Sequence, residues 1–377
     1  MVPEIPTFPS TPRRSAPLLI VMAMSLVAGS AGAFLLFWLF PEFRQANIPP
    51  GTQSVIIERP GRVVIEESTR LRELGGQNKR LVAGLYRPDA GLKIGATTIF
   101  PNKNLIGVAV LLTADGWFAT VSSADVRLGD ILLVEGRPYA IERIVADTVS
   151  PFIMGKVVGD RFTPVIFADT ENRYSGMTLW TLSPDEEIAK TTLHSDQLDF
   201  GASDHGPAKI ISSDKLNLAL SIESARQFLS GTPVFDLSGQ LVGFSVPTSD
   251  KAQAVLPSDI LQSLMLNVLK DGKPRRPFLG LTYVFDFYLT EQNNQTGAII
   301  YGEKPNNGIV PKSPAARAGL KLGDRLLSVN GTPISSSGSL FSLVQQYHPG
   351  DTIIFEYIRQ SQKFEAAVIA EELPVKK

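Results

Sequence analysis

The stretch Asn307–Ile334, NGIVPKSPAARAGLKLGDRLLSVNGTPI, decides the fold of the C-terminal part of the chain. Pro314 suits the first turn of a short helix, because its φ matches a helix and its missing N–H is not needed there. Gly319 can end that helix, and Gly323-Asp324 can turn the chain into a strand. Asn330-Gly331 predicts a tight hairpin. The stretch therefore predicts a small α+β unit.

This unit extends on both sides of the quoted stretch. Short β-like runs precede it at 278–283 and 298–301, and a helix over 339–347 and a strand over 352–358 follow it. About one hundred residues suffice for one small domain, which we place at residues 274–374.

The region before this unit consists of short β-rich runs separated by turn residues, from about Leu81 onward. Ala114-Asp115-Gly116 and Leu237-Ser238-Gly239 predict hairpin connections, since Gly supplies positive φ without steric cost. A helix over Ser258–Lys270 ends the region, and residues 273–277 predict a hinge. Many strands at this spacing predict a mainly β domain, a barrel or a sandwich, over residues 79–273.

Composition excludes several classes of protein. The 377 residues carry a net charge of -1 with both signs mixed along the chain, which argues against nucleic acid as a partner. There is no cysteine, so a disulfide framework, thiolate metal sites and a thiol nucleophile are excluded. His194 and His205, with Asp196 and Asp204, form no compact ligand motif, so we predict no metal site and no cofactor.

An uncharged segment near the N-terminus predicts a membrane anchor. Residues 16–40, which include LLIVMAMSLVAGSAGAFLLFWLF, are long enough as a helix to cross about 30 Å of hydrocarbon. A cleaved signal peptide is the alternative, because Ala31-Gly32-Ala33 has the small-x-small pattern of a processing site. The apolar run continues beyond these residues to Phe40, which favours a retained transmembrane helix.

The flanking residues orient this helix. Arg13 and Arg14 precede it, so the N-terminal residues 1–15 should stay cytoplasmic and everything from Pro41 should lie outside the cytoplasm. Residues 41–78 are rich in Pro and Gly and poor in apolar residues, which predicts a linker.

The C-terminal unit resembles a PDZ domain of the HtrA type. The resemblance is carried by NGIVPKSPAARAGLKLGDRLLSVNGTPI and by HPGDTIIFEYIR at His348–Arg359. It implies that a peptide end rests on the backbone N–H groups of a loop and adds as a β-strand beside the helix at 339–347. The residues implied to bind peptide are Phe278, Leu279, Gly280, Leu281, Leu340, Leu343 and Val344. The leucines could equally be ordinary core residues.

The β region resembles a trypsin-like domain of HtrA proteases. The resemblance is carried by GVAVLLTADGWFATVSS, SGTPVFDLSGQLVGFSVP and AVLPSDILQSLMLNVLKDGKPRRPFLGL, at 107–123, 230–247 and 254–281. It implies a double β-barrel, and the upstream anchor matches DegS-like members. It further implies a homotrimer in the bacterial cell envelope, periplasmic or extracellular, whose partners are peptides, unfolded segments or C-termini of envelope proteins.

The resemblance also assigns a catalytic triad, most of which is missing. Ser230 in Phe228-Leu229-Ser230-Gly231 stands at the nucleophile position, while Phe228 replaces the glycine that donates to the oxyanion. Ser123 occupies the position of the base histidine and Pro151 that of the acid. Asp125 and Asp147 lie near these positions, and His194, His205 or a lysine could in principle activate Ser230.

Three functions follow as hypotheses. The favoured one is a membrane-anchored pseudoprotease that binds peptides through its PDZ domain, and whether the chain is an enzyme stays uncertain. The alternative is an active serine endopeptidase in envelope protein quality control. The third is a structural envelope protein that uses neither groove.

Overall fold

The computed structural model describes Met24 and residues 67–169, 173–199, 210–224, 227–247, 253–285, 297–302, 307–334 and 339–374. The predicted cytoplasmic segment 1–15, the predicted membrane helix 16–40 apart from Met24, and most of the predicted linker 41–78 lie outside the described residues. Within the described residues, no helix is long and apolar enough to span a membrane. The chain divides into two compact units, of which the second, Glu66–Lys377, is described here.

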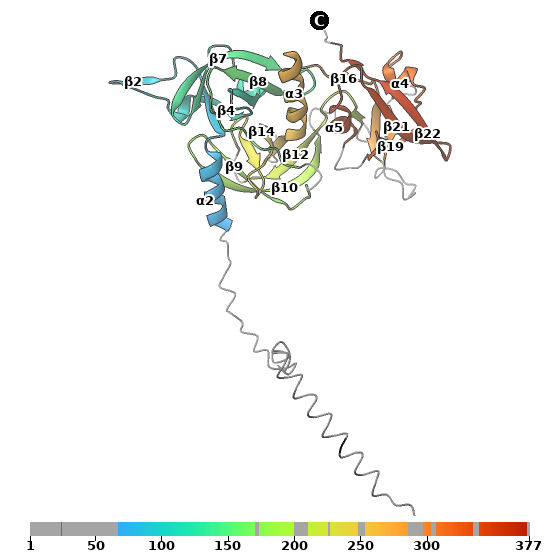
Figure 1. Cartoon of the computed structure of the whole chain (residues 1–377), viewed down its shortest axis with the longest axis horizontal. Helices are drawn as coiled ribbons and strands as arrows, with labels where there is room; N and C mark the ends of the chain where they lie inside the picture. The colour runs from blue at the N-terminus through green and yellow to red at the C-terminus, as the bar shows by residue number, and fades with distance from the viewer. Residues whose placement is uncertain are drawn as a thin grey trace, which may run out of the picture. The chain divides into compact units, whose positions relative to one another are not determined.

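The first part of this unit, residues 82–157, is a closed six-stranded antiparallel barrel (Figure 1). Its interior is filled by alternate side chains such as Leu85, Leu111 and Phe118, all fully buried. A separate hairpin, β2 and β3, extends the loop after β1. The barrel strands are β1 (Val82–Tyr86), β4 (Leu105–Leu111), β5 (Trp117–Val121), β6 (Ile131–Val134), β7 (Arg137–Ala146) and β8 (Phe152–Val157), and the hairpin is β2 (Leu92–Ile94) and β3 (Thr97–Ile99).

A second closed barrel follows, again of six antiparallel strands. Phe152 of the first barrel and Phe244 of the second meet edge to face, with ring centroids 5.6 Å apart, in a core shared by both barrels. The trypsin-like double barrel is thereby confirmed. The strands are β9 (Thr178–Leu182), β10 (Ile188–Asp199), β12 (Leu218–Glu223), β13 (Pro233–Phe235), β14 (Leu241–Val246) and β15 (Gln253–Pro257), and α3 (Ser258–Asp271) ends the region.

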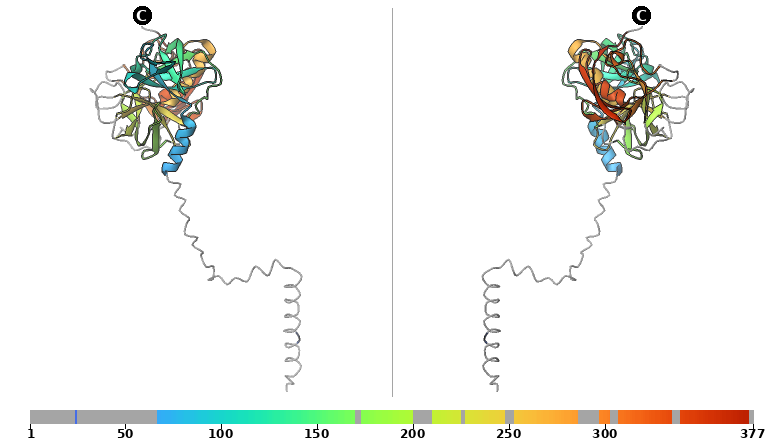
Figure 2. Two further views of the ribbon diagram at one scale, coloured as in Figure 1. Left: turned by 90° about the vertical axis from the view of Figure 1, so that its left-hand side faces the viewer. Right: turned by 90° about the vertical axis from the view of Figure 1, so that its right-hand side faces the viewer.

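The last residues of the predicted linker are folded. Helix α2 (Glu67–Asn78) is the blue helix in Figure 2. Its Leu71 and Leu74 are buried in the core shared by the barrels. The Asn78 side chain donates to the backbone oxygen of Gly239 at 2.9 Å. Two leucines three residues apart are enough to seat one face of this helix, although they are too few to show clear helical periodicity in the sequence.

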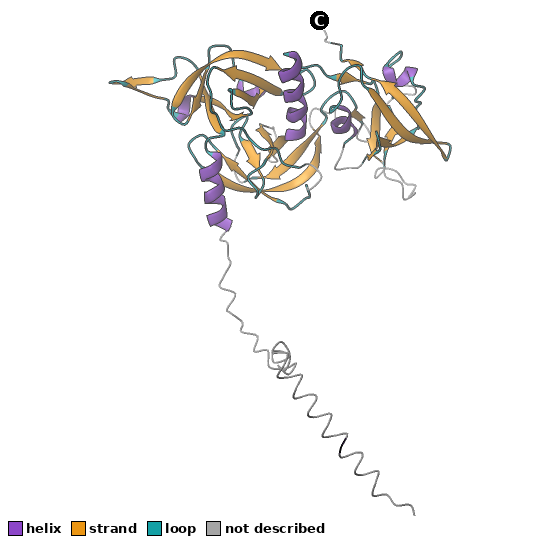
Figure 3. Cartoon of the chain, in the orientation of Figure 1, coloured by secondary structure: helices purple, strands orange, loops and turns teal. Residues whose placement is uncertain are grey.

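The C-terminal part is a twisted antiparallel sheet with two short helices (Figure 3). The Ser313 side chain caps the first helix by accepting from Ala316 N–H at 3.3 Å, as the Ser-Pro start predicts. The sheet order is β11-β17-β18-β19-β21-β22, with β20 beside β19. The elements are β11 (Ile211–Ser212), β17 (Thr282–Phe285), β18 (Ala298–Ile300), α4 (Pro314–Arg317), β19 (Arg325–Val329), β20 (Thr332–Pro333), α5 (Leu340–Val344), β21 (Thr352–Arg359) and β22 (Gln362–Ile369), and β16 (Pro277–Phe278) pairs with β23 (Glu371–Glu372).

One strand of this sheet comes from the barrel region. Strand β11 lies between β10 and β12 in the sequence, yet it pairs with β17 of the C-terminal sheet. The segment between two barrel strands therefore forms the edge of the C-terminal sheet, and no pattern in the sequence predicts this pairing.

The segment predicted as a hinge, residues 273–277, is fixed at one point. Arg276 is fully buried and donates two hydrogen bonds to the Asp147 carboxylate, at 2.9 and 2.7 Å. It also donates to the Ser263 hydroxyl at 2.8 Å. A bidentate pair of this kind holds the start of the C-terminal fold against the first barrel.

Candidate functional site

Ser230 lies where the two barrels meet. Its backbone oxygen accepts the N–H of Val108, on β4 of the first barrel, at 2.9 Å. The next residue, Gly231, has φ +82°, and a Cβ there would lie 2.2 Å from the Val108 oxygen. A glycine is therefore required after Ser230, and the loop is pressed against β4.

The structure brings the other two predicted triad positions to the same place. Ser123 is in a single turn of 3-10 helix, Ser122–Ala124, whose first N–H donates to the Pro151 oxygen at 2.7 Å. At Gly107 a Cβ would lie 2.5 Å from the Ala124 Cβ and 3.2 Å from the Ser230 oxygen. The backbone of these three positions thus lies close together, and the residues there are two serines and a proline. None of these groups is a base at neutral pH.

The nearby carboxylates are engaged elsewhere. Asp125 is exposed and pairs with Arg87 and Arg127, each at 2.7 Å, and both guanidinium groups hold the pKa of its carboxyl below the usual range, Arg127 more strongly. Asp147 is buried against Arg276. His194 is exposed on β10, and His205 lies outside the described residues.

The backbone N–H at the oxyanion position, that of Phe228, donates to a side chain of the protein itself. Phe228 N–H donates to the Gln253 side-chain oxygen at 3.0 Å, and the Gln253 amide donates to the Ser245 hydroxyl at 2.5 Å. Gln253 is buried and sits at the start of β15. A donor held by a buried amide is not directed at a reacting carbonyl. The sequence pattern marks Phe228 but not Gln253, because 25 residues separate them.

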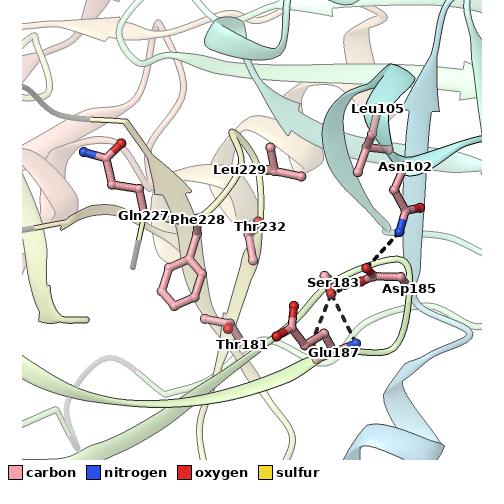
Figure 4. Close-up of a pocket in the computed structure, with 10 residues that line it drawn as sticks. All are labelled: Asn102, Leu105, Thr181, Ser183, Asp185, Glu187, Gln227, Phe228, Leu229 and Thr232. Atoms are coloured by element: carbon pink, nitrogen blue, oxygen red, sulfur yellow. Dashed lines mark hydrogen bonds between the residues drawn. The ribbon is translucent and has the colours of Figure 1, made fainter. Parts of the chain in front are cut away.

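A pocket of about 160 Å³ opens beside the Ser230 loop (Figure 4). Phe228 and Leu229 form one wall, and the carboxylates of Asp185 and Glu187 lie on the opposite side. Asn102 donates to Asp185 at 2.9 Å. Within the described residues, no group of three or more His, Asp or Glu could hold a metal ion.

The predicted peptide-binding residues of the C-terminal fold lie together. Leu279, Leu281, Leu340 and Val344 are fully buried in one cluster, Leu343 packs against it, and Phe278 on β16 is half-buried. Gly280 has φ +77°, and a Cβ there would lie 2.4 Å from the Ser313 Cβ. The loop 278–281 is therefore possible only with glycine at this position.

A buried carboxylate, that of Asp214, contacts this loop. Asp214 accepts the backbone N–H groups of Leu279 and Gly280, at 2.8 and 2.9 Å. Burial raises the pKa of Asp214 to about 6, against the lowering effect of these hydrogen bonds. No local pattern marks Asp214, because its partners are about 65 residues away.

Comparisons with known proteins agree with this geometry. A profile of the PDZ domain matches residues 289–369. A DegP-like periplasmic serine endoprotease of Halomonas elongata is 24% identical over 306 residues, covering 74% of this chain and 59% of the relative. Serine endoprotease DegS of Haemophilus influenzae is 19% identical, covering 72% of this chain and 78% of the relative. The chain spans about a third of the length of other curated relatives.

Solved structures show the same fold. The HtrA-type protease AlgW with a tripeptide superposes with a TM-score of 0.56 at 17% identity, covering 81% of this chain and 98% of that one. The chain therefore belongs to the class of proteins in which a trypsin-like double barrel is followed by a PDZ domain. The resemblance to HtrA-like serine proteases with a C-terminal PDZ domain is therefore confirmed in both sequence and fold.

Proposed function

We propose that this chain is a non-proteolytic HtrA-like protein that binds extended peptides or chain ends through its PDZ domain, residues 274–374. The proposal rests on the residues at the three triad positions, which are Ser123, Pro151 and Ser230. A serine hydroxyl without a neighbouring base stays protonated at neutral pH and is a weak nucleophile.

The oxyanion position supports the same conclusion. The Phe228 N–H is hydrogen-bonded to Gln253 at 3.0 Å. Transition-state stabilisation by such a donor contributes a factor of about 10² to 10³ to the rate. Among the described residues, the candidate active site therefore lacks both a base and this donor. In the proposal the double barrel, residues 79–273, is a scaffold for the PDZ domain.

The proposal includes a place in the cell envelope. The relatives are named periplasmic DegP-like and DegS proteases, and residues 16–40 form an uncharged stretch of membrane-spanning length. We place the N-terminus in the cytoplasm and the folded domains outside it. The partners would be peptides or unfolded or C-terminal segments of envelope proteins, bound by a membrane-anchored homotrimer.

An active serine endopeptidase is the second candidate. The presence of Ser230 favours this candidate, since the residue lies in a loop that is fixed between the barrels. Activity would need an unconventional base, and His194 and His205 are the first to examine.

A fluorophosphonate probe separates the two candidates, because it labels only activated serines. We expect no labelling of the full chain beyond that of its Ser230→Ala variant, under conditions in which a DegP-like protease is labelled completely. Labelling that requires Ser230 would favour the endopeptidase.

A further inference from the structure

The peptide groove of the PDZ domain holds a segment of the same chain. Strand β11 pairs antiparallel with β17 in the register Ile211 with Tyr283 and Ser212 with Thr282. The next N–H, that of Ser213, donates to the Leu281 oxygen at 3.0 Å. This edge of the sheet is where an extended peptide would add as a strand.

The same segment supplies a carboxylate to the loop that would receive a chain end. Both oxygens of Asp214 are used, one by Leu279 N–H and one by Gly280 N–H. The Ser213 hydroxyl accepts the third N–H of the loop, from Leu281, at 3.3 Å. The side chains of Ser213 and Asp214 therefore accept the backbone N–H groups of all three loop residues, Leu279 to Leu281.

The segment also supplies an apolar side chain, that of Ile211, as a bound peptide would. Ile211 is 1% exposed and belongs to the same core cluster as Leu279, Leu340 and Val344. A strand, an aliphatic anchor and a carboxylate are the three elements by which such a groove recognises a peptide.

We infer that Ile211–Asp214 is a built-in ligand of the PDZ groove, which an external peptide must displace. The inference rests on the proposed function and names its regulation. The preferred competitor has an aliphatic residue opposite Tyr283, followed by a carboxylate that reaches the N–H groups of Leu279 and Gly280. Because a tethered segment acts at an effective concentration of order mM, an external peptide of similar contacts binds the closed form weakly.

The segment Ile211–Asp214 is also connected to the barrels, on the side where the candidate active site lies. Leu216, two residues after Asp214, is buried in the barrel core, and its N–H donates to the Val149 oxygen at 3.1 Å. Displacement of residues 211–214 would therefore pull on the loop that contains Pro151. A ligand in the PDZ groove has in this way a physical connection to the barrels.

Engineered cysteines test the placement of the segment directly, because the chain has none of its own. Since Ser213 and Leu281 are a hydrogen-bonded pair, Ser212 and Thr282 form a pair of the closer kind, with Cα atoms about 4.5 Å apart. That spacing suits a disulfide. The matched control pairs Ser212→Cys with Thr352→Cys on β21, which lies four strands away and hence about 19 Å or more.

The second part of the experiment measures peptide binding by the wild-type full chain and by its variants. The probe is a fluorescent peptide that copies residues 207–214, is amidated at its end, and thus keeps Asp as its only carboxylate. We expect the Ser212→Cys/Thr282→Cys variant to form the disulfide and to bind no probe until it is reduced. Asp214→Asn should bind the probe at least about tenfold more tightly than the wild type, whereas Lys215→Ala, a change of the exposed neighbour, should not.

The outcomes separate the inference from the proposed function. A disulfide yield no higher than in the control, or equal probe affinity of wild type and Asp214→Asn, would overturn the built-in ligand. Disulfide formation without probe binding by any form would leave residues 211–214 in the groove and contradict peptide binding as the function.

Discussion

Arg276 and Asp147 form a bidentate ion pair with both side chains fully buried, although 129 residues separate them in the sequence. Asp147 directly follows β7, close to Pro151 at the position of the catalytic acid, and Arg276 lies at the start of the PDZ region. A carboxylate near the candidate active site thus serves to attach the second domain to the first.

Removal of one partner of this pair should be costly. Arg276→Ala leaves the Asp147 carboxylate buried without its cation, and we expect a loss of about 3 to 5 kcal/mol in the free energy of unfolding. Arg275→Ala is the control, since Arg275 pairs with Glu372 at 3.1 Å on the surface and should cost less than about 1 kcal/mol. Urea denaturation followed by fluorescence measures both. Equal losses would contradict the role given to the buried pair.

The peptide-receiving loop should tolerate no side chain at its glycine. Gly280→Ala combines a positive φ with a Cβ contact of 2.4 Å to Ser313, and we expect a loss of about 2 kcal/mol or more in stability. Gly319→Ala has nearly the same φ, +80°, but nothing within 4 Å of the added Cβ. Its loss, about 1 kcal/mol, isolates the backbone strain. Thermal unfolding of both variants gives the difference, and its absence would show that the loop can rearrange.

The Asp214 carboxylate should make stability depend on pH. Its pKa is raised in the folded protein, to about 6 from 3.8, chiefly by burial and despite the nearby charge of Lys215. The folded state therefore binds a proton that the unfolded state does not, and stability rises as the pH falls through 6. Relative to Asp214→Asn, we expect the wild type to gain about 1 kcal/mol between pH 7 and pH 5. Urea denaturation at both pH values checks this, and a constant difference would indicate an ordinary pKa for Asp214.

The regular parts of the fold could be predicted because their signals are local. Turn residues at Gly116 and Gly239, the Pro314 helix start and the strand runs between them are enough to predict a mainly β domain followed by a small α+β unit. The double barrel and the PDZ domain come from the resemblance to HtrA proteases. The contacts that define the sites are not local. Gln253 meets Phe228, Asp214 meets Leu279, and α2 packs its leucines on strands far along the chain. No spacing in the sequence marks such contacts, since only the folded chain brings these residues together.

A rebuilt triad should need the oxyanion donor as well. In Ser123→His/Pro151→Asp the base and the acid return, but Phe228 N–H remains bound to Gln253. Adding Gln253→Ala removes the acceptor that holds the Phe228 N–H, and we expect this triple variant to cleave unfolded casein about 10²-fold faster than the double variant. The triple variant with Ser230→Ala is the control for contaminating protease. Equal rates of the double and triple variants would show that the Phe228 N–H is not limiting.

The most direct test of the account is single-turnover cleavage of labelled unfolded casein by the full chain, beside its Ser230→Ala variant and with the PDZ probe peptide present and absent. The account predicts no cleavage that depends on Ser230 in either condition, because the triad positions hold Ser123 and Pro151 in place of a base and an acid. Ser230-dependent cleavage, with or without the probe, would contradict it and would show that the chain is an endopeptidase with an unconventional base.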